Sequence, residues 1–241
     1  MLFQRTKMNS GAPQTFHQIW LGNKPIPQSL RRYSQTWRDK HPEWLFELWD
    51  DARSHALVRE RYPHLWPIYE SLPYLTQQVD VIKYLVLYAF GGVYIDFDCE
   101  CLKPIDSLLT HPVCIGLEPR DEGLHRDFSV FLGSAYMSAI PKHEFFKATI
   151  ARCEEQLRLL TPRWQELGKY HYDMETTGPT LINRGYDDFE DKESVRLLPP
   201  ELIGPFRGRE ATLYRENKKM GYGAAKLSEA YAIHHFVGSW L

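Results

Sequence analysis

The sequence predicts an α/β fold in which helices cover a mostly parallel sheet. Short runs of β-branched and aromatic residues alternate along the chain with longer segments whose apolar residues recur at helical spacing. The 241 residues are 43% hydrophobic and 14% aromatic, enough to bury one large core. Because alternating strands and helices are typical of a doubly wound sheet, we expect a single domain over residues 1–241.

The first elements expected are a strand at 15–21, a helix at 27–40 and a strand at 45–49. Pro27 suits the first position of the helix, where its missing N–H costs nothing. Apolar residues at helical spacing then predict a helix at 75–90. Gly91 and Gly92 can adopt the left-handed backbone that ends a helix.

The run Val93, Tyr94 and Ile95 predicts a short buried strand, and Asp96 follows at its carboxyl end. Strands at 113–117 and 129–137, a long helix at 142–160 and a short strand at 231–236 complete the alternation.

Asp96 and Asp98 follow the strand at 93–95 directly, at the edge where open α/β sheets gather their ligands. In a sharp turn the two side chains can point into one crevice, one toward a sugar or ribose hydroxyl and the other toward a hard cation. Carboxylate oxygens suit Mg²⁺ or Mn²⁺. Asp-x-Asp alone is also typical of a solvated turn, but the helix, the glycine pair and the buried strand before it favour a site.

Five ordered blocks resemble a retaining glycosyltransferase family with a DXD sugar-binding region, which includes bacterial capsule and lipopolysaccharide sugar transferases and fungal mannosyltransferases. They are FHQIWLG at 16–22, PEWLFELWDD at 42–51, VDVIKYLVLYAFGGVYIDFDCECLKP at 79–104, TTGPT at 176–180 and AIHHFVGSW at 232–240. The first block and the DXD block are also distantly similar to the large glucosylating bacterial toxins.

The resemblance implies a Rossmann-like GT-A fold and a metal-dependent glycosyltransferase that uses Mn²⁺ or Mg²⁺. The expected reaction moves a hexose from a nucleoside diphosphate sugar to an acceptor hydroxyl with retention, in surface polysaccharide or glycoconjugate synthesis. A uridine diphosphate hexose is the favoured donor, because the Trp-Leu-Gly loop resembles that of uridine-using relatives; guanosine diphosphate mannose is the runner-up. The acceptor is a saccharide, a lipid-linked group or a protein.

The resemblance also assigns donor-binding residues. Trp20 and Gly22 are expected beside the nucleoside, with a core tryptophan as the alternative for Trp20. Asp80 and Lys83 share a helical face and are expected to reach the donor sugar, with a surface ion pair as the alternative. The family usually has arginine where this chain has Lys83, so contacts with the sugar hydroxyls are expected to differ.

The expected metal site combines the DXD turn with the C-terminal block. Asp98 is the expected direct ligand, and Asp96 is oriented toward ribose, the sugar and the metal shell. Because neighbouring residues on a strand face opposite ways, only one of His234 and His235 can face the metal. We favour His234 and keep His235 as the alternative. The resemblance implies that Ser239 and Trp240 hold the metal or the diphosphate, and Asp80, Asp96 and Asp98 are the candidate catalytic residues.

Three other functions stay open. A protein-modifying glycosyltransferase effector would use the same site. A phosphohydrolase would use Asp96 as a nucleophile, but such enzymes usually carry threonine or valine two residues after the second aspartate, where this chain has Glu100-Cys101. A non-catalytic sugar-binding domain would keep the pocket without turnover.

The remaining features bear on partners and location. A formal net charge of −2 gives no general field for nucleic acid, so none is expected. The longest apolar stretch is too short to span a bilayer, which predicts a cytoplasmic protein. The basic stretch at 207–226 is interpreted as a solvated loop, with contact to the diphosphate, an anionic acceptor or the inner face of the membrane as alternatives. Cys99 and Cys101 are interpreted as small residues at a strand edge, with a soft-metal or redox role as the alternative.

Overall fold

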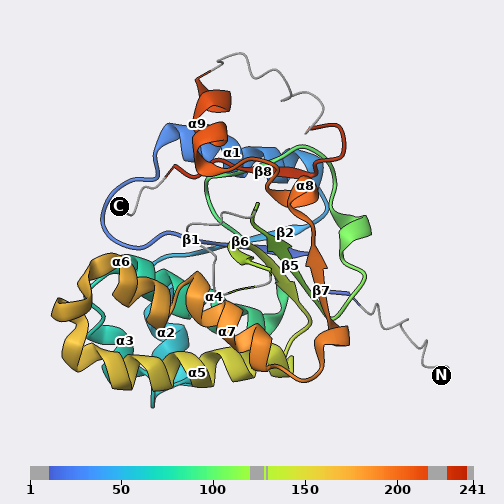
Figure 1. The fold of residues 1–241 in the computed structure, drawn as a ribbon. Helices are drawn as coiled ribbons and strands as arrows, with labels where there is room; N and C mark the ends of the chain where they lie inside the picture. The colour runs from blue at the N-terminus through green and yellow to red at the C-terminus, as the bar shows by residue number, and fades with distance from the viewer. Residues whose placement is uncertain (1–10, 120–127, 129, 217–226, 238–241) are drawn as a thin grey trace, which may run out of the picture.

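A six-stranded sheet forms the centre of the computed structural model, which describes residues 11–119, 128, 130–216 and 227–237 (Figure 1). The strands lie in the order β2-β1-β3-β6-β5-β7. Every neighbouring pair is parallel except the two that involve β6, which runs against β3 and β5. The strands are β1 (Thr15–Ile19), β2 (Leu45–Trp49), β3 (Gly92–Ile95), β5 (Val113–Leu117), β6 (Leu132–Ala139) and β7 (Val195–Leu198). The mostly parallel sheet expected from the sequence is confirmed.

Helices cover both faces of this sheet (Figure 1). Helices α2 to α7 lie over one face, and α1, α8 and α9 lie over the other. They are α1 (Gln28–Lys40), α2 (Asp51–Arg61), α3 (Trp66–Glu70), α4 (Leu75–Phe90), α5 (Glu144–Leu160), α6 (Trp164–Thr176), α7 (Pro179–Asp188), α8 (Pro200–Ile203) and α9 (Gly208–Arg215).

The alternation of side chains along the strands divides the core into two layers. In β3, Val93 and Ile95 belong to the cluster on the α1 side, which also contains Phe16 and Trp37. Tyr94 points the other way and joins the larger cluster beneath α4 and α5. Because β3 is buried on both faces, none of its residues faces solvent, which explains why its sequence is a continuous apolar run.

A second, two-stranded sheet pairs β4 (Cys99–Cys101) with β8 (Ala232–His234) in antiparallel register. The pairing brings residues near the C-terminus against the segment that follows Asp98. It therefore positions the site, although 130 or more residues separate the two strands in sequence.

Several elements differ from the sequence expectation; the strand expected at 15–21 ends at Ile19, and the helices expected at 27–40 and 142–160 begin one and two residues later. The strand expected at 231–236 is limited to β8, and the strand expected at 129–137 is β6, which begins later and ends later. The basic stretch at 207–226 is not a loop throughout, because its first part forms α9. Lys218, Lys219 and Lys226 lie outside the described residues. Within the described part of the chain, no helix is both long and apolar enough to cross a bilayer.

The two glycines that connect α4 to β3 have left-handed backbone, with φ of +67° at Gly91 and +92° at Gly92. A Cβ at Gly92 would lie 2.6 Å from the Thr15 carbonyl oxygen of the neighbouring strand. The backbone alone sets the position of a Cβ and of a carbonyl oxygen, so a rotamer change cannot relieve this contact. The sharp entry into β3, and hence the place of Asp96, requires glycine here.

We expect Gly92→Ala to lower the free energy of unfolding by more than about 2 kcal/mol, because left-handed strain of about 1–3 kcal/mol adds to this clash. Gly168→Ala is the matched control, since Gly168 has φ of +73° but no atom within 4 Å of an added Cβ. Urea unfolding measures the free energy of unfolding of both variants, and the difference between their losses gives the cost of the Thr15 contact apart from that of the backbone strain. Equal losses at the two positions would contradict the role of the Thr15 contact.

Candidate active site

A tight turn holds the two aspartates of the Asp-x-Asp sequence at the carboxyl end of β3. The Asp96 N–H donates to the Ala135 carbonyl on β6 at 2.9 Å, and the Cys99 N–H closes the turn on the Asp96 carbonyl at 3.1 Å. The Tyr94 hydroxyl donates to the Asp96 carboxylate. Both aspartate side chains are partly exposed, so they remain available to a ligand.

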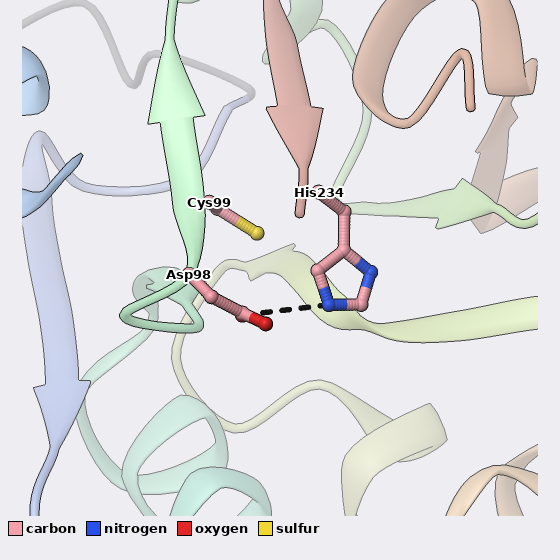
Figure 2. Close-up of side chains that lie close together, drawn as sticks. All are labelled: Asp98, Cys99 and His234. Carbon is pink, nitrogen blue, oxygen red and sulfur yellow. Dashed lines mark ion pairs between the residues drawn. The ribbon is translucent and has the colours of Figure 1, made fainter. Parts of the chain in front are cut away.

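The side chains of Asp98, which directly precedes β4, and His234, at the end of β8, point toward each other (Figure 2). Asp98 Oδ1 lies 3.4 Å from His234 Nε2, and Asp98 Oδ2 accepts from the Val237 N–H at 2.8 Å. Burial opposes the charge of Asp98, but His234 and the Val237 N–H outweigh it and lower the pKa of Asp98 to about 2. For His234, burial lowers the pKa and Asp98 raises it more, so the net shift is upward.

His235 follows β8; its N–H donates to the Asp98 carbonyl at 2.9 Å, but its side chain points to the opposite face, away from the Asp98 carboxylate. Its Nε2 is 2.9 Å from Glu100 Oε2, and its ring stacks on Tyr33 with centroids 4.2 Å apart. The structure thus brings His234, and not His235, to the Asp-x-Asp turn. Ser239 and Trp240 lie outside the described residues.

Asp80 and Lys83 form an ion pair on α4, with Lys83 Nζ 2.7 Å from Asp80 Oδ1. The residues are only 8% and 3% exposed, so the alternative of a surface pair is wrong. Lys83 Nζ also lies 4.8 Å from the centre of the Tyr94 ring, directly behind the Asp96 turn. The pair is therefore part of the same site as the aspartates.

Burial raises the pKa of Asp80 from 3.8 to about 7, against the lowering effect of Lys83, while the nearby carboxylates of Asp173 and Asp96 raise it further. Burial also opposes the charge of Lys83, but Asp80 and Asp96 outweigh it and raise the Lys83 pKa. Lys83 thus stays positive, and Asp80 takes up a proton near neutral pH.

Trp20 and Gly22 lie in the loop after β1. The Trp20 indole N–H donates to the Lys24 carbonyl at 2.7 Å, and its ring meets Phe97 edge-on at 5.5 Å. Trp20 is partly exposed rather than a core residue. Gly22 has φ of +85°, and its N–H donates to the Asp51 carboxylate at 2.9 Å. The loop therefore contacts the Asp-x-Asp turn through Phe97.

Three residues at the site were not recognised in this role from the sequence. Thr177 Oγ1 lies within hydrogen-bonding distance of Asp80 Oδ2 (3.1 Å) and Asp173 Oδ1 (3.3 Å). Glu118 follows β5, where burial raises its pKa, and its charge interacts with His234 and Asp96. Glu118 could have been predicted as a site residue from the sequence, because it directly follows an expected strand, as Asp96 does.

Residues 27–114 match the model of the family described as "Glycosyltransferase sugar-binding region containing DXD motif". The chain is similar to inositol phosphoceramide mannosyltransferase 1 of Schizosaccharomyces pombe, 30% identical over 197 residues, which cover 80% of this chain and 57% of that protein. It is also similar to inositol phosphoceramide mannosyltransferase 2 of the same organism, 32% identical over 146 residues (61% and 39%). The matches thus span roughly half of these relatives' lengths.

Among solved structures, the fold is similar to the UDP-bound glycosyltransferase domain of the YGT toxin, with a TM-score of 0.58 and 9% identity over 79% of this chain and 80% of that one. The fold is that of the GT-A glycosyltransferases. The relatives are named mannosyltransferases, and the expected resemblance to DXD-containing glycosyltransferases is confirmed.

Proposed function

We propose that this protein transfers a hexosyl group from a nucleoside diphosphate sugar to an acceptor hydroxyl, with a divalent metal and with retention of configuration. The observation that carries the proposal is the meeting of Asp98 and His234 at 3.4 Å beside Asp96, at the carboxyl end of β3. The buried Asp80–Lys83 pair adjoins the same turn, where a donor sugar would lie.

The residues fit a divalent metal. Asp98 offers a carboxylate that is ionised at neutral pH, and His234 offers an imidazole nitrogen on the facing strand. Mn²⁺ and Mg²⁺ accept such ligands and leave positions for diphosphate oxygens. When bound, the metal would act as a Lewis acid that stabilises charge on the departing diphosphate.

The protein's own groups would orient the donor. Trp20 can stack on the nucleobase, and Gly22, which has no side chain, would let the loop backbone come close to it. Ionised Asp80 can accept hydrogen bonds from sugar hydroxyls, while Lys83 holds the carboxylate in place and balances its charge. The Tyr94 hydroxyl holds the Asp96 carboxylate, which would lie between the ribose and the donor sugar. Bond breaking would then need no proton donor, because the departing diphosphate is a weak base whose charge the metal would stabilise.

Two nucleotide sugars are candidates for the donor. The Trp-Leu-Gly loop favours a uridine diphosphate hexose, and a solved structure with this fold is described as UDP-bound. The relatives' names favour mannose as the sugar, and hence guanosine diphosphate mannose. Those names also favour a lipid-linked acceptor over a soluble saccharide or a protein. With such an acceptor we propose glycoconjugate synthesis, by a cytoplasmic protein in peripheral contact with the membrane.

A panel of nucleotide sugars incubated with the purified protein and Mn²⁺ tests this function. We expect release of nucleoside diphosphate from one donor, and loss of release with a chelator. Donor binding without release would favour the sugar-binding domain, and phosphate release from simple esters would favour the phosphohydrolase. Neither binding nor release with any donor would contradict the proposal.

A further inference from the structure

The Cys99 thiol lies beside the Asp98–His234 pair (Figure 2). Cys99 is the first residue of β4, and its partner across the antiparallel pair is His234. Cross-strand partners project to the same face, so the sulfur and the imidazole are neighbours by register. Ligand atoms of Asp98, Cys99 and His234 all lie within 4.8 Å of one another.

The other cysteine of the strand provides an internal contrast. Cys101 is also buried, but its cross-strand partner is Ala232, which offers no ligand atom. Its thiol donates to the Lys103 carbonyl at 3.2 Å. Within the described residues, the one group of three or more metal-ligating side chains this close together is Asp98, Cys99 and His234. A structural role as a small buried residue at a strand edge therefore accounts for Cys101, whereas Cys99 lies beside two candidate metal ligands, Asp98 and His234.

The Cys99 thiol makes only a weak hydrogen bond to its acceptor. Its hydrogen-bond acceptor is the Ala135 carbonyl at 3.8 Å, near the limit for a sulfur donor. The backbone of Cys99 is fixed instead, because the Trp37 indole N–H donates to its carbonyl at 2.8 Å. A tetrahedral ion with bonds of about 2.0–2.3 Å holds its ligand atoms about 3.3–3.8 Å apart. Asp98 Oδ1 and His234 Nε2 already lie 3.4 Å apart, so the sulfur alone would have to approach them, by no more than about 1.5 Å, on a backbone that stays in place.

We propose that Cys99 is a third protein ligand and that this site takes thiophilic divalent cations, Zn²⁺ and Co²⁺, in preference to Mg²⁺. The inference rests on the proposed metal role of Asp98 and His234. One carboxylate oxygen, one thiolate and one imidazole nitrogen are a ligand set of zinc proteins, whereas Mg²⁺ and Mn²⁺ prefer oxygen. On binding, the metal–sulfur bond forms as the thiol proton leaves to solvent, and any proton on the coordinating nitrogen of His234 leaves as well, so at least one proton is released for each ion bound at neutral pH.

Titration of the metal-free protein with Co²⁺ tests the proposal without donor or turnover. We expect a near-ultraviolet sulfur-to-cobalt charge-transfer band in the native protein and in the matched control Cys101→Ala, and no such band in Cys99→Ala. Competition with Zn²⁺ should show at least about tenfold weaker binding in Cys99→Ala, while Mg²⁺ binding stays unchanged. Circular dichroism checks that each variant is folded.

If Cys99→Ala does not fold, Cys99→Ser keeps the side-chain size, and X-ray absorption of the Zn²⁺-loaded native protein looks directly for a sulfur neighbour. Absence of the band in the native protein, absence of sulfur around zinc, or an equal band in the Cys99 variant would overturn the assignment. Nucleotide release with Mn²⁺ in a protein that lacks the band would overturn this inference alone. A band in a protein that turns over no donor would leave the inference standing and remove the proposed function.

Discussion

Asp98→Asn is expected to lower kcat for nucleotide-sugar turnover by about 10²–10³-fold, the loss typical when one charge-stabilising group is removed from a reaction centre. Asp98 is ionised at neutral pH, with its pKa lowered to about 2, and asparagine keeps the shape without the charge. The Val237 N–H can still donate to the amide oxygen, so the turn should persist. The measurement is kcat at saturating donor across a Mn²⁺ titration.

Glu100→Gln is the matched control for this variant. Glu100 stands two residues further along, and it faces His235 on the other side of the small sheet. Glutamine still offers an oxygen to His235, so turnover should stay within about twofold of native for a substitution at this partly exposed position, whose side chain faces away from Asp98. An unchanged kcat in Asp98→Asn, or equal losses in both variants, would contradict the role assigned to Asp98.

The sequence was sufficient for the parts of the site that are local. Gly91 and Gly92 end α4, the run after them makes a buried strand, and Asp96 therefore lies at the sheet edge. These features follow from periodicity and backbone preference within about 20 residues. The same reasoning predicted that Asp80 and Lys83 share a helical face, as their 2.7 Å contact confirms.

Features that depend on contacts between residues far apart in the chain could not be predicted from the sequence. Strand alternation says that one of His234 and His235 faces the turn, but the register Cys99↔His234 decides which. Asp80 accepts a hydrogen bond from Thr177, 97 positions away, whose Thr-Gly-Pro sequence also opens α7 as an ordinary helix-entry turn. A single sequence carries no signal for such contacts, because propensity acts only between near neighbours.

Lys83→Met is expected to lower the free energy of unfolding by about 3–5 kcal/mol at pH 8, the loss typical when one partner of a buried ion pair is removed. Methionine fills a similar volume, so the loss would come from leaving the Asp80 carboxylate without its cation, with Asp96 and Asp173 close by. Urea unfolding at pH 6 and pH 8 measures it.

The pH dependence follows from the Asp80 pKa. It is already raised from 3.8 to about 7 in the native protein, and removal of Lys83 takes away the largest effect that lowers it. The folded variant therefore binds a proton that the unfolded chain has released, from about pH 4 to above pH 7. Its stability falls as pH rises through that window, so the loss should be smaller at pH 6 than at pH 8.

The double variant Asp80→Asn/Lys83→Met distinguishes a lost charge partner from lost packing. It removes the group that needs the cation, so it should recover much of the stability lost in Lys83→Met and lose most of the additional pH dependence. A double variant as unstable as Lys83→Met at both pH values would assign the loss to packing. If the charge explanation holds, Lys83 keeps Asp80 ionised where a donor sugar would bind, and donor affinity in the native protein should rise as pH increases through about 7.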